Sequence, residues 1–182
     1  EAVELILERL RFYKAIIIPN RQSPHKLPYE ISDEHRLNMV RLAFAESEKL
    51  EISTFELYRP EPSYAINTIL HFKEKFPQNE IYFVLGEDAF YALPEWFEFP
   101  KVLHSCSYIV LKRQGYDEDR TQSVIQEMLE EKLIRPLAFN DLGSTELRID
   151  RAFETAKKTK VLLLNHTLPE VSSTEIRCRK SL

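Results

Sequence analysis

The stretch Val161-Leu162-Leu163-Leu164 is followed, after a short loop from His166 to Glu170, by Val171-Ser172-Ser173-Thr174-Glu175-Ile176-Arg177. Four consecutive apolar residues predict a buried strand, and the polar residues after the loop predict the first turn of a helix. With Ser172 as the N-cap, Glu175 stands at the third helical position and completes a capping box. A buried strand, a loop and a helix start in this order indicate an α/β protein.

The start of this helix also predicts a binding site for an anion. Ser173, Thr174 and the backbone amides of the first turn lie at the positive end of the helix dipole, where phosphate binds well. Helical side chains lean toward the N-terminus, so Arg177 can reach back and add a bidentate cation. A well-capped helix without any ligand explains the same pattern, because capping boxes are common. Other segments of the chain have to decide between these two interpretations.

Short apolar runs alternate with helical patterns through the rest of the chain. The runs that predict strands are 15–18, 50–57, 81–85, 108–111 and 161–164. The helical patterns are 1–12, 32–47, 63–76, 121–133 and, with less regular spacing, 144–158. Ser32 and Ser63 are the candidate N-caps of two of these helices. Because the strand patterns are continuously apolar, we expect a parallel sheet covered by helices.

Composition narrows the class of protein. The 182 residues suit one domain, and 43% hydrophobic with 30% charged residues is typical of a soluble globular chain. A net charge of −4 argues against broad nucleic-acid binding, and no apolar run approaches the length of a membrane span. Cys106 and Cys178 have no metal-type spacing, so we expect reduced thiols, no protein metal site and a cytoplasmic location.

Ligands of an open parallel sheet bind beyond the carboxyl ends of its strands, and several segments at these places are unusual. After the first strand, the run Pro19-Asn20-Arg21-Gln22-Ser23-Pro24-His25-Lys26 presents Arg21, His25 and Lys26 on a loop stiffened by two prolines. A solvated basic loop is the alternative. After the second extended segment comes Glu56-Leu57-Tyr58-Arg59-Pro60-Glu61-Pro62-Ser63-Tyr64-Ala65-Ile66-Asn67-Thr68, in which Ser63 can be an ordinary helix cap.

The third such segment follows the clearest strand and contains Gly86, Asp88 and Trp96. Gly86 can let a ligand approach the backbone closely, and the Asp88 carboxylate can accept hydrogen bonds. Trp96 is the only tryptophan, and a core residue is the alternative to a stacking platform because its apolar area is large. The next strand ends at Lys112-Arg113-Gln114-Gly115, where Arg113 is a candidate phosphate contact.

Together these segments resemble the bacterial nicotinate-nucleotide adenylyltransferases. That family carries P-x-x-x-x-P-H-K, E-x-x-R…S-Y-T-I-D-T, G-x-D-x-x-x-x-L-x-x-W, a basic residue before a Gly, and I-S-S-T-x-I-R. Each match alone is weak, but five matches in the same order from Ala15 to Arg177 are specific. This chain departs from the family at Ala65, where Thr is typical, and at Asn67, where Asp is typical, so we expect weaker recognition of the nicotinate carboxylate.

The resemblance implies a doubly wound, Rossmann-like nucleotidyltransferase domain. It implies transfer of AMP from ATP to nicotinate mononucleotide, giving deamido-NAD and pyrophosphate, with Mg²⁺ accompanying ATP. The ATP-binding residues that it implies are Ser172, Ser173, Thr174, Arg177, Gly86 and Asp88. The residues that it implies for nicotinate mononucleotide are His25, Lys26, Ala65, Ile66, Trp96 and Arg113.

Other functions remain open at this point. The same fold serves phosphopantetheine adenylyltransferases and cytidylyltransferases, although Trp96 with the 63–68 stretch favours a nicotinate substrate. A nucleotide-binding module without catalysis is also possible, because the family's catalytic H-x-G-H histidines are not found here. A parallel sheet without its central strand would expose two unpaired edges, so we expect roughly 20 further residues upstream to carry that motif. The catalytic residues, the oligomeric state and the preference for nicotinate over nicotinamide stay open.

Overall fold

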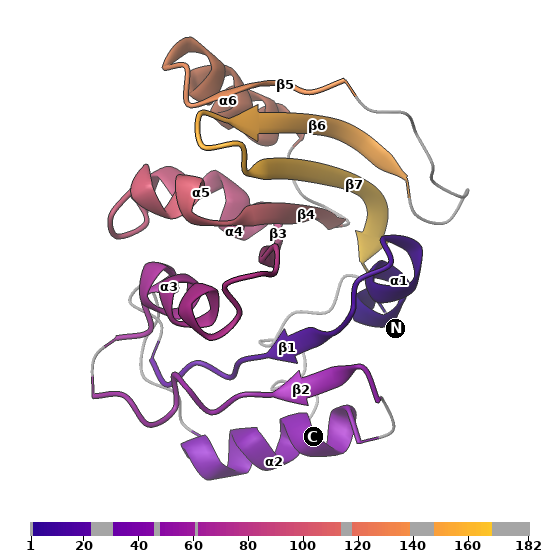
Figure 1. Cartoon of the computed structure of the whole chain (residues 1–182), viewed down its shortest axis with the longest axis vertical. Helices are drawn as coiled ribbons and strands as arrows, with labels where there is room; N and C mark the ends of the chain where they lie inside the picture. The colour runs from indigo at the N-terminus through magenta and orange to yellow at the C-terminus, as the bar shows by residue number, and fades with distance from the viewer. Residues whose placement is uncertain are drawn as a thin grey trace, which may run out of the picture. The chain divides into compact units, whose positions relative to one another are not determined.

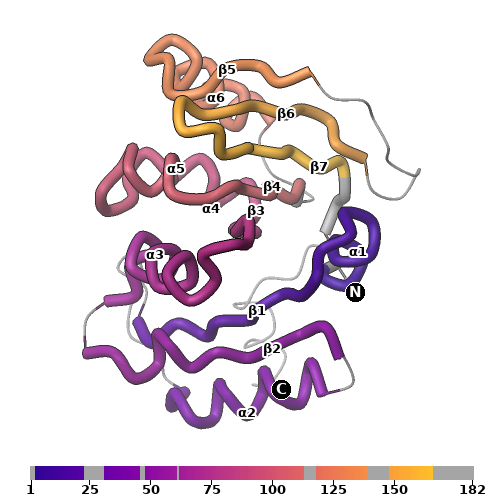
Figure 2. The backbone as a smooth tube through the Cα atoms, viewed as in Figure 1, coloured from indigo at the N-terminus to yellow at the C-terminus, as the bar shows by residue number. Residues whose placement is uncertain are grey.

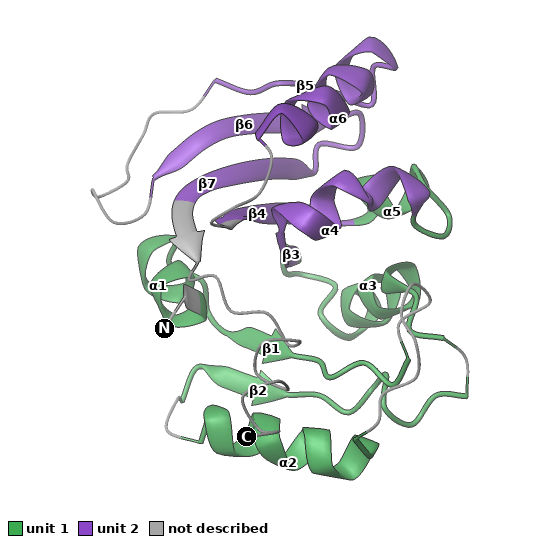
Figure 3. Cartoon of the chain, turned by 180° about the vertical axis from the view of Figure 1, so that it is seen from behind, with its two compact units in different colours: residues 1–81, 96–105 green, residues 82–95, 106–182 purple. Residues whose placement is uncertain are grey.

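The computed structural model describes residues 2–22, 31–45, 48–60, 62–113, 118–138 and 148–168. It combines parallel strands with helices, so the predicted α/β class is confirmed (Figure 1). Contacts between residues divide the chain into two compact units (Figure 3): unit 1 comprises residues 1–81 and 96–105, and unit 2 comprises residues 82–95 and 106–182. That the two units form one domain, as expected from the sequence, stays a prediction.

Unit 1 is built on two short parallel strands, β1 (Ala15–Ile17) and β2 (Leu50–Ile52). Its helices are α1 (Ala2–Arg9), α2 (Asp33–Ala43), α3 (Ala65–Lys75) and α5 (Lys101–Ser105). The helices supply most of its buried apolar side chains, which include Ile6, Leu7, Leu37, Ile66, Ile69, Phe72, Val102 and Leu103. Ile17 lies opposite Ile52, so the chain leaves both strands at the same edge of this small sheet.

The first turns of α2 and α3 differ in how they are capped. Ser32 is the N-cap of α2 and accepts a hydrogen bond from the His35 N–H at 3.2 Å, as predicted. The prediction that Ser63 caps the next helix is wrong, because α3 begins at Ala65 and its N-cap is Tyr64. The Ser63 hydroxyl oxygen instead accepts the backbone N–H of Arg21 at 3.2 Å. The Ser63 hydroxyl therefore bonds a residue that is distant in the sequence and does not cap the helix that follows it.

An ion pair ties the two strands of unit 1 together and makes its stability depend on pH. The Lys14 ammonium hydrogen-bonds the Glu51 carboxylate, and Lys75 Nζ lies 3.7 Å from the same side chain. The hydrogen bond from Lys14 holds the pKa of Glu51 below its ordinary value of 4.5. A group with a lowered pKa in the folded state stabilises that state above its unfolded pKa and loses this contribution as the pH falls through the folded pKa.

We therefore expect Glu51→Gln to flatten the acid limb of the stability curve. Between about pH 6 and pH 3 the unmodified protein should lose more of its melting temperature than the variant loses. The difference should be small, because both partners are partly exposed and such pairs contribute little. Melting curves across this pH range test the point, and parallel curves for the two proteins would contradict it.

Unit 2 contains a five-stranded sheet in the order β3-β4-β7-β6-β5. The strands are β3 (Tyr82–Gly86), β4 (Ser107–Arg113), β5 (Ile134–Pro136), β6 (Ile149–Thr155) and β7 (Lys160–Leu168). The helices are α4 (Glu87–Tyr91), the 3₁₀ helix η1 (Leu93–Glu95) and α6 (Glu118–Glu130), and Figure 2 follows the chain through them. β3, β4 and β7 are parallel, as predicted, whereas β6 runs antiparallel to both of its neighbours, β7 and β5. The five residues from Ser107 to Leu111 are all buried, as expected of a strand inside a sheet.

The helix predicted for Ser144–Lys158 is wrong, because the described part of this range contains β6. β6 and β7 form a hairpin, in which Thr155 N donates to Thr159 O at 2.8 Å and Lys158 N donates to Thr155 O at 2.9 Å. Lys158 has a φ of 63°, in the left-handed region that tight turns use. The turn contains neither glycine nor asparagine, so its sequence does not carry the usual hairpin signal.

β5 is the end strand of this sheet and has only three residues. Among the described strands it pairs with β6 alone, with Arg135 opposite Glu154. Arg135 and Glu154 also form an ion pair through their side chains. Arg135 and Pro136 are exposed.

Candidate functional site

One edge of the unit 2 sheet collects several residues predicted to bind the nucleotide. In the parallel pairing Gly86 lies beside Leu111, and Arg113 lies beside Leu168. The chain therefore leaves β3, β4 and β7 at a common edge, which is where open α/β sheets bind ligands. Gly86 and Asp88 lie at this edge. For Arg113 only the backbone is described, and it lies at the same edge.

Gly86 provides room for the Asp88 carboxylate at the start of α4. A Cβ atom at Gly86 would lie 2.6 Å from Asp88 Oδ1, so the carboxylate folds back over the glycine. The φ of Gly86 is −82°, which any residue adopts, so the glycine here supplies space and not backbone freedom, and a larger residue would make the Asp88 side chain shift. Asp88 is exposed and its carboxylate remains reachable from solvent. An acceptor held in this way suits a ribose hydroxyl.

A buried polar pair fixes the helix that carries Asp88. Glu87 is 4% exposed, and Thr121 of α6 is fully buried. The Thr121 hydroxyl donates to Glu87 Oε1 at 3.1 Å, which joins α4 to α6. A buried hydrogen bond of this kind restrains both residues. If it breaks, a polar group stays buried without a hydrogen-bond partner and without water, which costs free energy. Sequence reasoning missed this pair, since Glu87 and Thr121 belong to different segments.

Thr121→Val should destabilise the protein by about 1–3 kcal/mol, because valine keeps the shape but removes a hydrogen bond to the buried Glu87 carboxyl group. Urea unfolding of the variant and the unmodified protein measures this. Ser123→Ala, at an exposed position of the same helix, is the control and should change stability by less than about 0.5 kcal/mol. Equal stabilities for Thr121→Val and the control would show that the pair contributes nothing.

In unit 1 a small pocket opens at the start of α3. Its lining residues come from the segment after β2 and the first turn of the helix: Phe55, Glu56, Arg59, Pro62, Ser63, Tyr64, Asn67 and Thr68. Tyr64, the N-cap, makes no side-chain hydrogen bond to the amides of the first turn. Ala65 and Ile66, the first two residues of α3, were both predicted to lie at the substrate site. A helix start that lacks a side-chain cap favours an anionic ligand.

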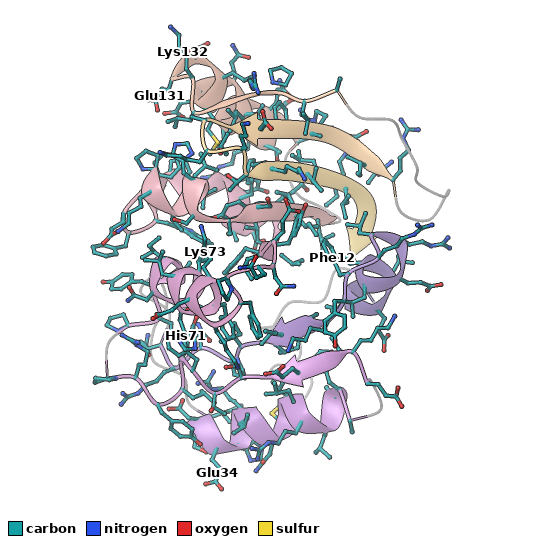
Figure 4. The ribbon with its side chains drawn as sticks, viewed as in Figure 1. Phe12, Glu34, His71, Lys73, Glu131 and Lys132 are labelled. Atoms are coloured by element: carbon teal, nitrogen blue, oxygen red, sulfur yellow. The ribbon has the colours of Figure 1, made fainter. Side chains whose placement is uncertain are left out.

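The wall of this pocket is held by polar and aromatic contacts. The Thr68 hydroxyl donates to Glu56 Oε1, which links α3 to the segment after β2. The Phe55 ring stacks on His71 at a centroid distance of 3.8 Å, and the Arg59 guanidinium lies 5.0 Å from the Phe55 ring centroid. His71 and Lys73 project from α3 in different directions (Figure 4). These contacts give the pocket a fixed wall.

Trp96 follows η1 and is only half-buried, so it is not one of the fully buried core residues. Its neighbour Phe97 is 52% exposed and lies against Tyr64, with ring centroids 4.5 Å apart. Phe97 thus connects the segment of Trp96 to the N-cap of α3. Sequence reasoning missed Phe97, although an aromatic residue next to the predicted platform was a usable signal. The partial exposure of Trp96 leaves area for a ligand ring.

Six predicted site residues lie outside the described part of the chain. They are His25, Lys26, Ser172, Ser173, Thr174 and Arg177. Their roles therefore rest on the sequence alone. In the described ranges no three His, Cys, Asp or Glu side chains gather as a metal site would require. No helix in those ranges has both the length and the apolar character needed to cross a membrane.

Comparison with known proteins identifies the family. The family model for cytidylyltransferase-like proteins matches residues 2–179. A probable nicotinate-nucleotide adenylyltransferase of Pelobacter propionicus is 34% identical over 165 residues, which cover 90% of this chain and 71% of the relative. The chain belongs to the cytidylyltransferase-like family and, within it, to the nicotinate-nucleotide adenylyltransferases. The resemblance stated from the motifs is thereby confirmed.

Further relatives of this adenylyltransferase family agree. A probable nicotinate-nucleotide adenylyltransferase of Clostridium botulinum (strain Okra / Type B1) is 31% identical over 148 residues, covering 78% of this chain and 74% of the relative. The solved structure of Plasmodium falciparum nicotinic acid mononucleotide adenylyltransferase complexed with NaAD matches 96% of this chain and 72% of its own, with a TM-score of 0.57 and 18% identity. At that identity the structural match supports the nucleotidyltransferase fold alone.

Proposed function

We propose that the chain transfers AMP from ATP to nicotinate mononucleotide, forming deamido-NAD and pyrophosphate. The observation that carries this proposal is the match of residues 2–179 to the family together with relatives that bear the name nicotinate-nucleotide adenylyltransferase. The uncapped start of α3, beside its small pocket, adds a place where a negatively charged substrate group can bind. The proposed setting is NAD biosynthesis in the cytoplasm.

The proposed roles divide between the two substrates. Ser172, Ser173, Thr174 and Arg177 bind the outer phosphates of ATP, and Gly86 with Asp88 binds the ribose side. His25, Lys26 and Arg113 bind the phosphate of the mononucleotide. The amides at Ala65 and Ile66 bind the nicotinate carboxylate, and Trp96 stacks on the pyridine ring. Ala65 lacks the hydroxyl that is typical of the family, so this recognition depends on the backbone.

The reaction needs no protein nucleophile. A phosphate oxygen of nicotinate mononucleotide forms a bond to the α-phosphorus of ATP, and the bond to the bridging oxygen of pyrophosphate breaks in line with it. The protein contributes by placing the two phosphates and by offsetting their charge. Mg²⁺ bound to ATP shares that charge.

Pyrophosphate release tests the proposed function. The full chain is incubated with ATP and Mg²⁺, together with nicotinate mononucleotide, phosphopantetheine or no second substrate. We expect release with the mononucleotide only, and deamido-NAD as the second product. Release with phosphopantetheine would assign the chain to another nucleotidyltransferase reaction. ATP binding without any release would indicate a non-catalytic nucleotide-binding module.

A further inference from the structure

The loop after β1 is bonded directly to the loop that leads into α3. The Arg21 N–H donates to the Ser63 hydroxyl oxygen at 3.2 Å, and the Ser63 N–H donates to the Gln22 carbonyl at 2.9 Å. The Arg21 guanidinium adds a third bond, from Nη1 to the Arg59 carbonyl at 2.7 Å. Three hydrogen bonds therefore join two segments that lie about forty positions apart in the sequence. None of them belongs to a helix or a sheet.

The first turn of α2 holds the other side of Arg21. Arg36 Nη2 donates to the Arg21 carbonyl at 3.3 Å and to Asp33 Oδ1 at 2.6 Å. The second oxygen of Asp33 lies 4.0 Å from Arg21 Nε. Asp33 thus lies between two guanidinium groups, and the side chain of Arg36 is only 16% exposed. Charge-assisted bonds of this kind fix direction as well as distance. Arg21 is therefore restrained at its backbone and at its side chain.

We propose that Arg21 is a positioning residue, which holds Arg59 and Ser63 so that the first amides of α3 face the carboxylate of the substrate ring. The inference rests on the proposed function. Arg59 and Ser63, which Arg21 bonds, both line the pocket at the start of α3. Ser63 lies two residues before the first helical residue, Ala65. A shift of this loop therefore shifts the helix start.

Positioning matters more here than in a site that has side-chain donors. Tyr64 gives the first turn no side-chain hydrogen bond, and Ala65 has no hydroxyl group. Discrimination between a ring carboxylate and a ring amide then depends on where the backbone N–H groups point. Displacements of about 1 Å are enough to weaken such a contact strongly. Arg21 acts on this discrimination through the loop and not through contact with the substrate.

Two variants of the full chain test the inference, Arg21→Ala and Ser63→Ala. KM and kcat are measured with nicotinate mononucleotide, with nicotinamide mononucleotide and with ATP. Each variant should raise KM for nicotinate mononucleotide about three- to tenfold, since about one net hydrogen bond is lost. KM for ATP and kcat should stay within about twofold. Arg21→Ala removes the bond to the Arg59 carbonyl, and Ser63→Ala removes the bond accepted from the Arg21 N–H, so the double variant should raise KM more than either single variant.

Nicotinamide mononucleotide separates positioning from direct binding. Both substrates carry the phosphate, so a direct contact of Arg21 with phosphate would raise KM for both equally. A positioning role lowers the ratio of kcat/KM for the acid over the amide. Arg41→Ala is the matched control, because Arg41 is exposed on α2 and hydrogen-bonds Asn38 of the same helix. It should leave both substrates unaffected.

The outcomes distinguish this inference from the proposed function. If the unmodified chain releases no pyrophosphate from nicotinate mononucleotide, the proposed function fails. Another outcome is that the unmodified chain releases pyrophosphate while Arg21→Ala and Ser63→Ala have the same KM for nicotinate mononucleotide as the unmodified chain. If they also have the same ratio of kcat/KM for the acid over the amide, the positioning role is overturned. Equal losses with both mononucleotides would also overturn it. Melting curves show whether each variant is folded, and Ser63→Ala carries the test if Arg21→Ala melts early.

Discussion

Trp96→Ala is expected to weaken the binding of nicotinate mononucleotide by about 5- to 150-fold while leaving the fold intact. Stacking of an aromatic side chain on a base contributes about 1–3 kcal/mol, and this range corresponds to that loss of affinity. Trp96 is only half-buried, so its removal should cost less stability than removal of a core aromatic residue. Isothermal titration with the mononucleotide and a melting curve measure the two effects on one variant.

Two control variants show what the loss of a buried aromatic residue and the loss of an exposed one do to stability. Phe90 is fully buried, and Phe90→Ala should cost about 3–5 kcal/mol of stability. Tyr13 is 86% exposed, and Tyr13→Ala should change neither stability nor affinity. If Trp96→Ala instead melts like Phe90→Ala and binds the mononucleotide normally, Trp96 is a core residue and the stacking role is wrong.

Arg177→Ala is expected to weaken ATP binding by about 10- to 150-fold. A charge-assisted hydrogen bond contributes about 1.5–3 kcal/mol, and Arg177 is predicted to form a bidentate contact with the outer phosphates. Titration with a non-hydrolysable ATP analogue measures the loss, and thermal stability in the absence of ligand should barely change. The affinity for nicotinate mononucleotide should also stay the same.

The neighbouring Arg179 provides the control for Arg177. In the helix predicted from the sequence, a side chain two positions further along would point to nearly the opposite side, so Arg179→Ala should retain most of the ATP affinity. The pair of variants separates a specific contact from a general effect of positive charge, because each removes one arginine. Equal losses for both variants would show that the predicted phosphate contact does not exist.

Local signals predicted much of the fold correctly. Ser32 caps α2, the apolar run at 81–85 ends near Gly86 as β3 does, and the buried run at 108–111 lies within β4. These elements follow from a few adjacent residues. The hairpin of β6 and β7 could not be predicted in this way, because its turn from Ala156 to Thr159 lacks the residues that usually mark turns.

In the candidate site, too, features that depend on adjacent residues were predicted from the sequence, whereas contacts between distant residues were not. The order of the post-strand segments predicted the family; Gly86 ends β3, and Asp88 and the start of α3 lie beyond strand ends as expected. The bond from Arg21 to Ser63 spans 42 positions, and that from Thr121 to Glu87 spans 34, so no local pattern contains them. The failed prediction of Ser63 as a cap has this cause, because Arg21 occupies the oxygen that a cap would use.

The three-residue strand β5 also bears on how the protein behaves at high concentration. The outer edge of a sheet can recruit a strand from another molecule and begin aggregation. In β5 this template is very short, Pro136 has no N–H to offer, and the exposed Arg135 places a charge on it. The described edge formed by β5 is therefore a poor template for β-pairing with another molecule.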